Sequence, residues 1–109
     1  MATSYKVLGQ ANPAATTATT LYTVPAATNA VISTVVIANL AATAATFRIS
    51  VRPAGGAQTN AMYIAYDVTL AASDSTALTL GITMAATDVL TVYSSSTTVA
   101  FTAFGSEIA

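Results

Sequence analysis

The charged side chains of this 109-residue chain are few, and they limit the chemistry available to it. They are Lys6, Arg48, Arg52, Asp67, Asp74, Asp88 and Glu107. The chain contains no His and no Cys, which excludes Ser–His–Asp and Cys–His nucleophiles and the usual zinc sites. Two carboxylates could hydrolyse a glycoside, but such sites normally lie in an aromatic cleft, and the chain has no Trp. We therefore expect no enzymatic activity, no catalytic residue and no cofactor.

A tetrad of the form Ala-Ala-(Ser/Thr)-(Asp/Asn) occurs at residues 26–29, 71–74 and 85–88, each time before a run rich in apolar residues. Asp and Asn side chains can accept a hydrogen bond from the backbone N–H two residues on, which stabilises a turn. The tetrad therefore predicts a corner at the start of a strand. Asp74 and Asp88 could instead bind a hard cation through oxygen atoms, but no calcium-loop ligand set surrounds them, and no metal site is expected.

Arg48 and Arg52 lie four residues apart in the alternating segment TFRISVRP. On a strand they would therefore share one face. They could lie on a solvated face or pair with Asp67 across strands, an interaction worth roughly 0.2–1 kcal/mol. They could instead bind an acidic partner surface through bidentate hydrogen bonds to carboxylates. These two arginines are the candidate partner-contact residues.

The elements that position these side chains are predicted to be strands, because apolar residues alternate with a period of two. In residues 46–53 the alternating series is Phe47, Ile49 and Val51. In residues 76–83 it is Leu78, Leu80 and Ile82. In residues 61–70 one apolar face is expected to comprise Met62, Ile64, Tyr66, Val68 and Leu70. Each segment should bury one face and expose the other.

The whole chain, residues 1–109, is predicted to form one domain of about eight short strands. The strands are expected at 4–9, 19–24, 30–39, 45–52, 61–70, 76–83, 88–94 and 97–104. Turn signals between them recur every 8–12 residues or so, which is typical of an all-β fold. We expect an antiparallel β-sandwich, jelly-roll-like in form. The low-complexity segment 11–20 is expected to be an exposed flexible loop or an arm laid on a neighbour.

The composition narrows the classes of partner. Charged residues make up 6% of the chain, against about 25% in a typical soluble domain. Three basic side chains are too few for direct nucleic-acid binding. The most apolar segment, 30–45, is interrupted by polar residues, so no membrane-spanning helix is expected. The N-terminal residues lack the apolar region of a signal peptide, which predicts synthesis in a cytoplasm. Low charge suits a subunit whose surface is covered by neighbours.

Six runs taken in order resemble small structural proteins of tailed bacteriophages, including phages of cyanobacteria. These runs are LYTVPA (21–26), TFRISVRPAGG (46–56), YIAYD (63–67), LTLGIT (78–83), TDVLTVY (87–93) and FTAFGSEI (101–108). Within that group a chain of this size looks most like a capsid decoration, or cement, protein. The resemblance consists of strands and turns, so it carries no binding residue over to this chain.

The resemblance implies a virion protein, made in the host cytoplasm, that sits on the outside of the phage head. It further implies a homotrimer that binds the major capsid protein and stabilises contacts between capsomers. Two alternatives remain open. One is a structural component of the phage tail, neck or baseplate, and the other is a receptor- or carbohydrate-binding fibre module.

Overall fold

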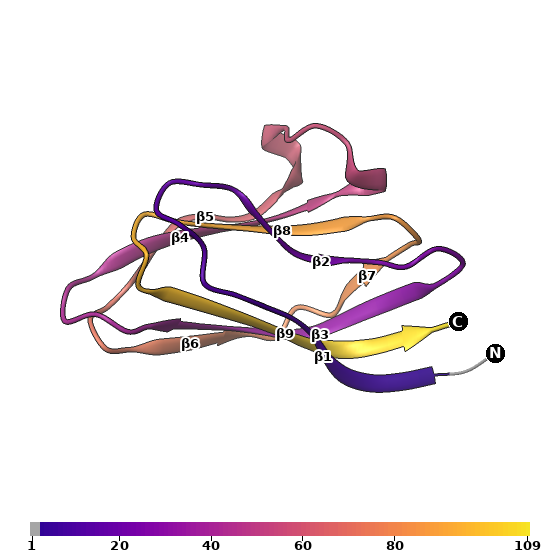
Figure 1. The fold of residues 1–109 in the computed structure, drawn as a ribbon, viewed down its shortest axis with the longest axis horizontal. Coiled ribbons are helices and arrows are strands. Elements are labelled where there is room, and N and C mark those ends of the chain that lie inside the picture. Colours follow the sequence, from indigo (N-terminus) through magenta and orange to yellow (C-terminus); the bar gives the residue numbers. More distant parts are fainter. Residues whose placement is uncertain (1–2) are drawn as a thin grey trace.

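Alternating apolar residues along the chain build two antiparallel sheets that pack face to face (Figure 1). The structure is a computed structural model that describes residues 3–109. Its strands are β1 (Thr3–Ala11), β2 (Thr19–Thr23), β3 (Asn29–Asn39), β4 (Ala45–Arg52), β5 (Tyr63–Leu70), β6 (Ser75–Leu78), β7 (Ile82–Met84), β8 (Val89–Ser94) and β9 (Val99–Ile108). Two short 3-10 helices, η1 (Pro53–Gly55) and η2 (Asn60–Met62), lie in the loop between β4 and β5.

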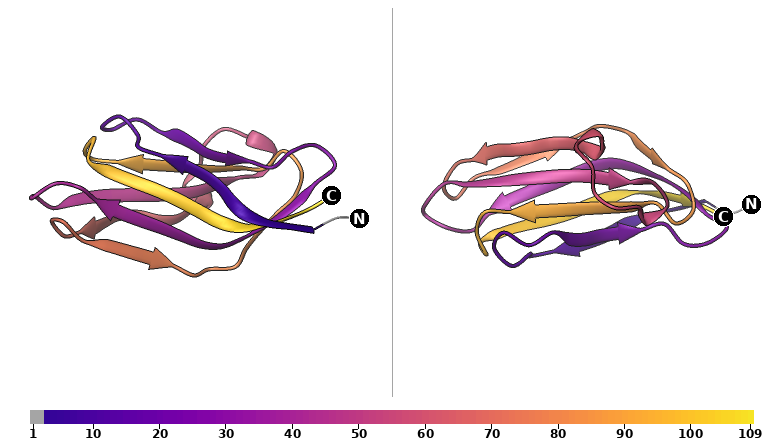
Figure 2. Two further views of the ribbon diagram at one scale, coloured as in Figure 1. Left: turned by 60° about the horizontal axis from the view of Figure 1, so that its bottom comes forward. Right: turned by 90° about the horizontal axis from the view of Figure 1, so that it is seen from above.

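The strand order is that of a jelly roll. Sheet A contains β1, β9 and β3, with β6 and β7 both pairing to the far edge of β3, and sheet B contains β2, β8, β4 and β5 in that order. The chain crosses from one sheet to the other at every connection except those from β4 to β5 and from β6 to β7, and Figure 2 shows the sandwich from two further directions. This arrangement of strands in two sheets is that of a jelly roll, which is built from two Greek keys. The predicted all-β, jelly-roll-like sandwich is therefore confirmed.

The core lies between the sheets and is filled by the inward faces of the longer strands. Phe47 and Ile49 of β4 are fully buried, as the alternation in that segment predicted. The ring of Phe47 meets the ring of Phe101 on β9 edge to face, with centroids 6.2 Å apart. Such aromatic pairs stabilise a core by about 0.5–1.5 kcal/mol beyond the area that they bury.

The predicted strand 76–83 is divided into β6 and β7. β6 pairs with Val35–Ala38 of β3, and β7 pairs with Ala30–Ile32. Between them Gly81 has φ +62°, which breaks the pleat. Leu80 is 50% exposed and does not continue the buried alternation. The described chain therefore has nine strands instead of the eight expected. The strands predicted at 61–70 and 97–104 also differ in bounds, because β5 begins at Tyr63 and β9 continues to Ile108.

A β-bulge in β5 overturns the single apolar face expected for residues 61–70. Ile49 of β4 lies opposite Ala65, and Phe47 lies opposite Val68, so two residues of β5 oppose Arg48 alone. Asp67 in this bulge has φ +50°. A bulge shifts the alternation by one residue, so Ala65 packs against the core. Two members of the expected face, Ile64 and Tyr66, are 45% and 55% exposed.

The repeated tetrads form turns, as predicted, but not through the hydrogen bond expected. The N–H of Asp74 donates to the carbonyl of Ala71, and that of Asp88 donates to the carbonyl of Ala85. Instead of bonding the N–H two residues on, the Asp74 carboxylate accepts from the next residue, Ser75. The third residue of each turn, Ser73 or Thr87, has positive φ, as position i+2 of a type II turn requires. In the tetrad at 26–29 the positive φ falls one residue earlier, at Ala27.

Candidate interaction surfaces and binding site

Arg48 is held on the outer face of sheet B by three neighbouring side chains. Its Nε lies 2.6 Å from Oδ1 of Asp67, and Nη2 lies 3.3 Å from Oδ2. The guanidinium carbon lies 4.2 Å from the ring centre of Tyr66 and 4.3 Å from that of Tyr93. The cross-strand pairing with Asp67, one of the two interpretations of the sequence, is thus present. Cation–π contacts with the two rings hold the guanidinium in place.

The ion pair shifts the pKa values of both partners. The hydrogen bond from Arg48 lowers the pKa of Asp67, although partial desolvation opposes this shift. The hydrogen bond to Asp67 raises the pKa of Arg48, again against desolvation. Both groups are therefore fully charged near neutral pH, and each neutralises the other.

Arg52 and Asp88 hold the loop of residues 53–62 against sheet B. Arg52 donates from Nε to Thr91 Oγ1 at 3.1 Å and from Nη1 to the carbonyl of Gly56 at 3.1 Å. Asp88 accepts from the N–H of Ala54 at 2.8 Å through Oδ1. Its other oxygen, Oδ2, accepts from the N–H of Ala85 at 2.9 Å. In Figure 1 this loop stands above the outer face of sheet B. Both candidate arginines thus contact groups of their own chain: Arg48 contacts Asp67 and two tyrosine rings, and Arg52 contacts Thr91 and the loop.

Beside Arg48, two tyrosine rings form a right-angled hollow that we call the aromatic corner. It is lined by Asn60 of η2 and by Tyr63 and Tyr66 of β5, and its volume is about 360 Å³. The two ring centres lie 4.8 Å apart, with the ring planes at 80°. The corner therefore offers two apolar surfaces and one carboxamide.

One side of the sandwich is closed, where the edges of β1 and β2 meet. Glu107 Oε1 lies 2.7 Å from Nζ of Lys6, and Glu107 Oε2 accepts a hydrogen bond from the Tyr22 hydroxyl. These contacts join β9 and β1 of sheet A to β2 of sheet B. Gly9 of β1 passes so close that a Cβ built on it would lie 2.0 Å from the Leu21 carbonyl oxygen. The two sheets can approach here because Gly9 has no side chain.

The pKa values of Glu107 and Tyr22 reflect this cluster. The ammonium of Lys6, and then the hydroxyl of Tyr22, lower the pKa of Glu107 through hydrogen bonds. Burial raises the pKa of Tyr22, and the nearby Glu107 carboxylate raises it further. The carboxylate is thus favoured in its ionised form and the phenol in its neutral form.

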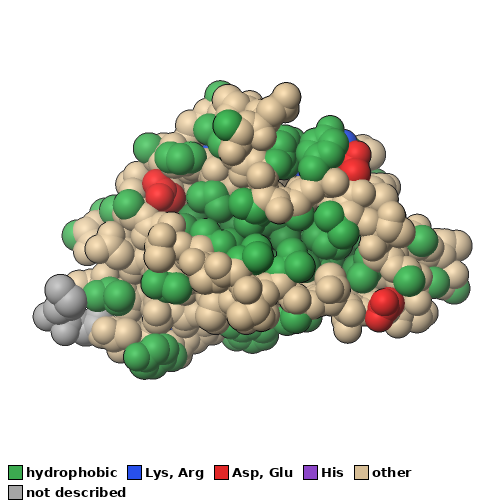
Figure 3. Space-filling model, turned by 180° about the vertical axis from the view of Figure 1, so that it is seen from behind, with side chains coloured by type: hydrophobic (Ala, Val, Ile, Leu, Met, Phe, Trp, Pro, Cys, Tyr) green, Lys and Arg blue, Asp and Glu red, His purple; other side chains and the backbone are tan. Residues whose placement is uncertain are grey.

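The opposite side of the sandwich is open. We define the open side as the gap between β5, the edge of sheet B, and β6–β7, the edge of sheet A, which do not pair with one another. Seen from behind, hydrophobic side chains fill a hollow in the middle of this face (Figure 3). Ala65, Leu78 and Ile82 pack against the core but remain partly exposed. Val68 and Leu80 are 41% and 50% exposed. Residues 75–84 carry no charge, so this edge has no charged side chain to discourage pairing.

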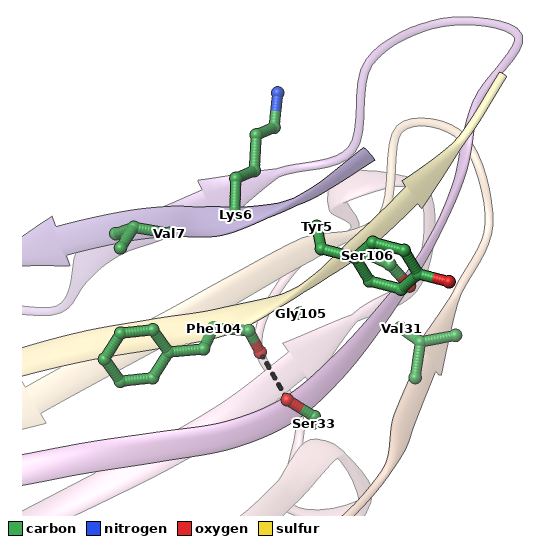
Figure 4. A pocket seen from close by; sticks show the side chains of 8 residues that line it. All are labelled: Tyr5, Lys6, Val7, Val31, Ser33, Phe104, Gly105 and Ser106. Carbon is green, nitrogen blue, oxygen red and sulfur yellow. Dashed lines mark hydrogen bonds between the residues drawn. The ribbon is translucent and has the colours of Figure 1, made fainter. Parts of the chain in front are cut away.

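A second exposed apolar surface lies on the outer face of sheet A, and we call it the outer hollow (Figure 4). Tyr5 of β1 is 84% exposed and Phe104 of β9 is 37% exposed, and both line a hollow of about 460 Å³ together with Val7 and Val31. Ser33 donates a hydrogen bond to the carbonyl of Phe104 at 3.2 Å. In Figure 4 the ring of Tyr5 lies across β9 above Ser106, whereas Lys6 points away from the hollow.

The segment 11–20 is hydrogen-bonded to its own chain. Asn12 donates from Nδ2 to the carbonyls of Thr97 and Val99 at 2.9 and 2.8 Å. The N–H of Thr16 donates to the carbonyl of Ser94 at 2.8 Å, and Pro13 is buried. Residues 12–18 therefore form a loop, between β1 and β2, that is anchored to the end of β8, the start of β9 and the connection between them.

Residues 3–109 contain no group of three or more acidic side chains placed to hold a metal ion. Asp74 and Asp88 occupy separate turns and bond backbone N–H groups. In the same range no helix is long and apolar enough to cross a membrane.

The fold and its surfaces define this protein as a jelly-roll β-sandwich with one closed and one open side. Comparisons of the chain with protein-family models, with curated proteins and with solved structures give no match.

Sequence reasoning identified Arg48 and Asp67 but missed the aromatic corner. Tyr63 and Tyr66 are three residues apart, and on a regular strand an odd spacing places side chains on opposite faces. They meet because β5 is irregular, with register shifts on both sides of Ala65. The only available signal was local composition, since YIAYD brings two of the five tyrosines into five residues.

Proposed function

We propose that this chain is a virion structural protein of a tailed bacteriophage that decorates the outside of the head. In this role it binds the major capsid protein as a homotrimer and cements contacts between capsomers. The resemblance of six runs in the sequence supports this function. The jelly roll agrees with it, because viral capsid domains use this fold, although a fold alone does not define a function.

The observation that carries the proposal is the open side. Val68 and Leu80 remain 41% and 50% exposed beside partly exposed core residues. Apolar surface in water costs about 25 cal/mol per Å², and contiguous apolar patches on soluble proteins generally mark interaction sites. We assign the open side to contacts between copies in the trimer, where burial of β5 and β6–β7 would complete the core.

A cement protein needs many copies and moderate contacts, and it needs no reaction. Because it binds the assembled shell, it stabilises that shell by mass action. The surfaces left outside the trimer contact, including the outer hollow around Tyr5 and Phe104, would then be available to the capsid. The low charge of the chain, 6%, suits contacts that are largely apolar.

The first test is the number of copies per purified virion relative to the major capsid protein, measured by quantitative mass spectrometry. A ratio near one, or a simple fraction of it, is expected. A handful of copies per particle would place the chain in the tail, neck or baseplate, and the cement mechanism would be wrong.

The trimer contact is tested separately with Leu80→Asp. Its matched control is Leu40→Asp, because Leu40 is also an exposed leucine, at 72%, but lies after β3, outside the open side. Light scattering should show a trimer for the wild type and for Leu40→Asp, and a monomer for Leu80→Asp. A monomeric wild type, or a trimeric Leu80→Asp variant, would overturn the assignment of the open side.

A further inference from the structure

The aromatic corner has the size and lining of a ligand site. Its volume of about 360 Å³ falls within the range of about 300–1,000 Å³ typical of small-molecule pockets. Such pockets combine apolar walls with a few placed polar groups. Here the walls are the rings of Tyr63 and Tyr66, and the polar group at the rim is the Asn60 carboxamide.

The corner is organised before any ligand arrives. Tyr66 packs against the Arg48 guanidinium, and Asp67 fixes that guanidinium through two hydrogen bonds. The edge-to-face contact with Tyr63 restrains the ring further. These side chains are already ordered, so a ligand that stacks in the corner would bind without the entropy cost of ordering them. A smaller entropy cost means a higher affinity.

Unused polar groups surround the apolar surfaces. Among the side-chain hydrogen bonds of residues 3–109, none involves the Asn60 carboxamide or the hydroxyls of Tyr63 and Tyr66. A carboxamide both donates and accepts, and so does a phenol. The nearest charges, Arg48 and Asp67, neutralise one another, and no charged residue lines the corner.

We propose that the aromatic corner binds a neutral sugar ring of an oligosaccharide. A pyranose presents an apolar C–H face to an aromatic ring and carries adjacent hydroxyls that can pair with both ends of the Asn60 carboxamide. A charged ligand would find no free counter-charge at the site. A prolyl ring would also fit the two tyrosines, but proline has no N–H donor and can pair directly only with the amide N–H groups of Asn60, whereas adjacent sugar hydroxyls can pair with both ends of the carboxamide.

The site binds and does not hydrolyse the sugar. Glycoside hydrolysis requires two carboxylates on either side of the bond. The carboxylate of Asp67, next to Tyr66 in the chain, has both oxygens bonded to Arg48. This binding is independent of where in the virion the chain resides, so its test and the copy-number test can fail separately.

The experiment is an NMR titration of the ¹⁵N-labelled full chain with the methyl glycosides of glucose, galactose, mannose and N-acetylglucosamine. Tyrosine fluorescence gives a second readout, because the chain has no Trp and five Tyr. We expect at least one glycoside to shift the amide resonances of Asn60, Tyr63 and Tyr66, with a dissociation constant on the order of 1 mM for a single ring.

Two variants and one control make the test specific. Asn60→Ala and Tyr63→Leu should each weaken binding about tenfold. The control, Tyr5→Leu, removes an exposed tyrosine on the other sheet and should leave binding unchanged. If no glycoside shifts these resonances at about 50 mM, a concentration well above the expected dissociation constant, the proposal is wrong. It is also wrong if both variants, shown to be folded by their spectra, bind as the wild type does. Binding of a proline-rich peptide at the corner without any binding of glycosides would assign the site to a different ligand.

Discussion

Replacing Asp88 by Ala should destabilise the protein more than the same replacement of Asp74, although both residues end the same kind of turn. The Asp88 carboxylate accepts hydrogen bonds from the N–H groups of Ala54 and Ala85, at 2.8 and 2.9 Å. The Asp74 carboxylate accepts one, from Ser75, and is exposed. Side-chain caps of backbone N–H groups contribute about 0.5–2 kcal/mol each. We therefore expect losses of about 2–3 kcal/mol for Asp88→Ala and about 1 kcal/mol for Asp74→Ala.

Urea unfolding of the two variants beside the wild type measures these losses, and thermal unfolding supplies a second value. A difference of 1 kcal/mol corresponds to roughly 4–8 °C in Tm for a domain of about this size. Hydrogen exchange then locates the effect. The amide of Ala54 should exchange faster in Asp88→Ala, because its acceptor is gone, and should be unaffected in Asp74→Ala. Equal losses in the two variants, or an unchanged Ala54 amide, would refute the anchoring role assigned to Asp88.

Three further predictions concern backbone approach and titration. Gly105→Ala should lower the free energy of unfolding by about 3 kcal/mol in urea unfolding, because its Cβ would lie 1.9 Å from the Val31 carbonyl oxygen. Gly81→Ala has open space around its Cβ, so it should cost only the 1–2 kcal/mol or so of a non-glycine residue at positive φ. The pKa of Glu107 is lowered by its Lys6 and Tyr22 partners, so its contribution to stability is present above the unfolded pKa of about 4.3 and is lost as the pH falls through the lower folded value. Urea unfolding at about pH 6 and about pH 3 should therefore show a smaller acid loss for Glu107→Gln than for the wild type, and equal losses would contradict this. Burial raises the pKa of Tyr22, so its contribution is present below the unfolded pKa of about 10 and is lost as the pH rises above that value. Absorbance titration of the folded protein should then show that Tyr22→Phe removes a phenol that ionises above the usual value of about 10, and removal of one that ionises at that value would count against the assignment.

The alternation of apolar residues was sufficient to predict the fold wherever a strand runs without interruption. β4 illustrates this, since Phe47 and Ile49 are buried as their spacing required. The alternation did not predict the structure where a bulge or a turn interrupts the two-residue repeat of a strand. Positive φ values at Asp67 and Gly81 shift or break the pleat, and the position of such a break depends on the partner strand as well as on local propensity.

The surfaces were harder to predict than the strands, because they depend on which edges meet. Asp67 could be proposed as the partner of Arg48 from cross-strand reasoning. The packing of Arg48 against Tyr66 and Tyr93 could not, since it requires the bulge in β5 and the neighbouring strand β8. The open side likewise follows from the absence of pairing between β5 and β6–β7, which is a property of the assembled sandwich and not of either segment.

The position of β9 has a consequence for how the chain folds. β9 lies between β1 and β3 in sheet A, so that Thr3 is paired with Ile108. Contacts between residues this far apart in sequence slow folding, because a long loop must close before they form. Synthesis proceeds from the N-terminus, so almost the whole described chain must be made before β9, the partner of β1, is available for pairing. The hairpin of β4 and β5, which are close in sequence and pair directly, can form long before sheet A is complete. Tyr5 and Val7 therefore lie on an unpaired strand until β9 has been synthesised, and during this interval β1 can pair with other nascent chains.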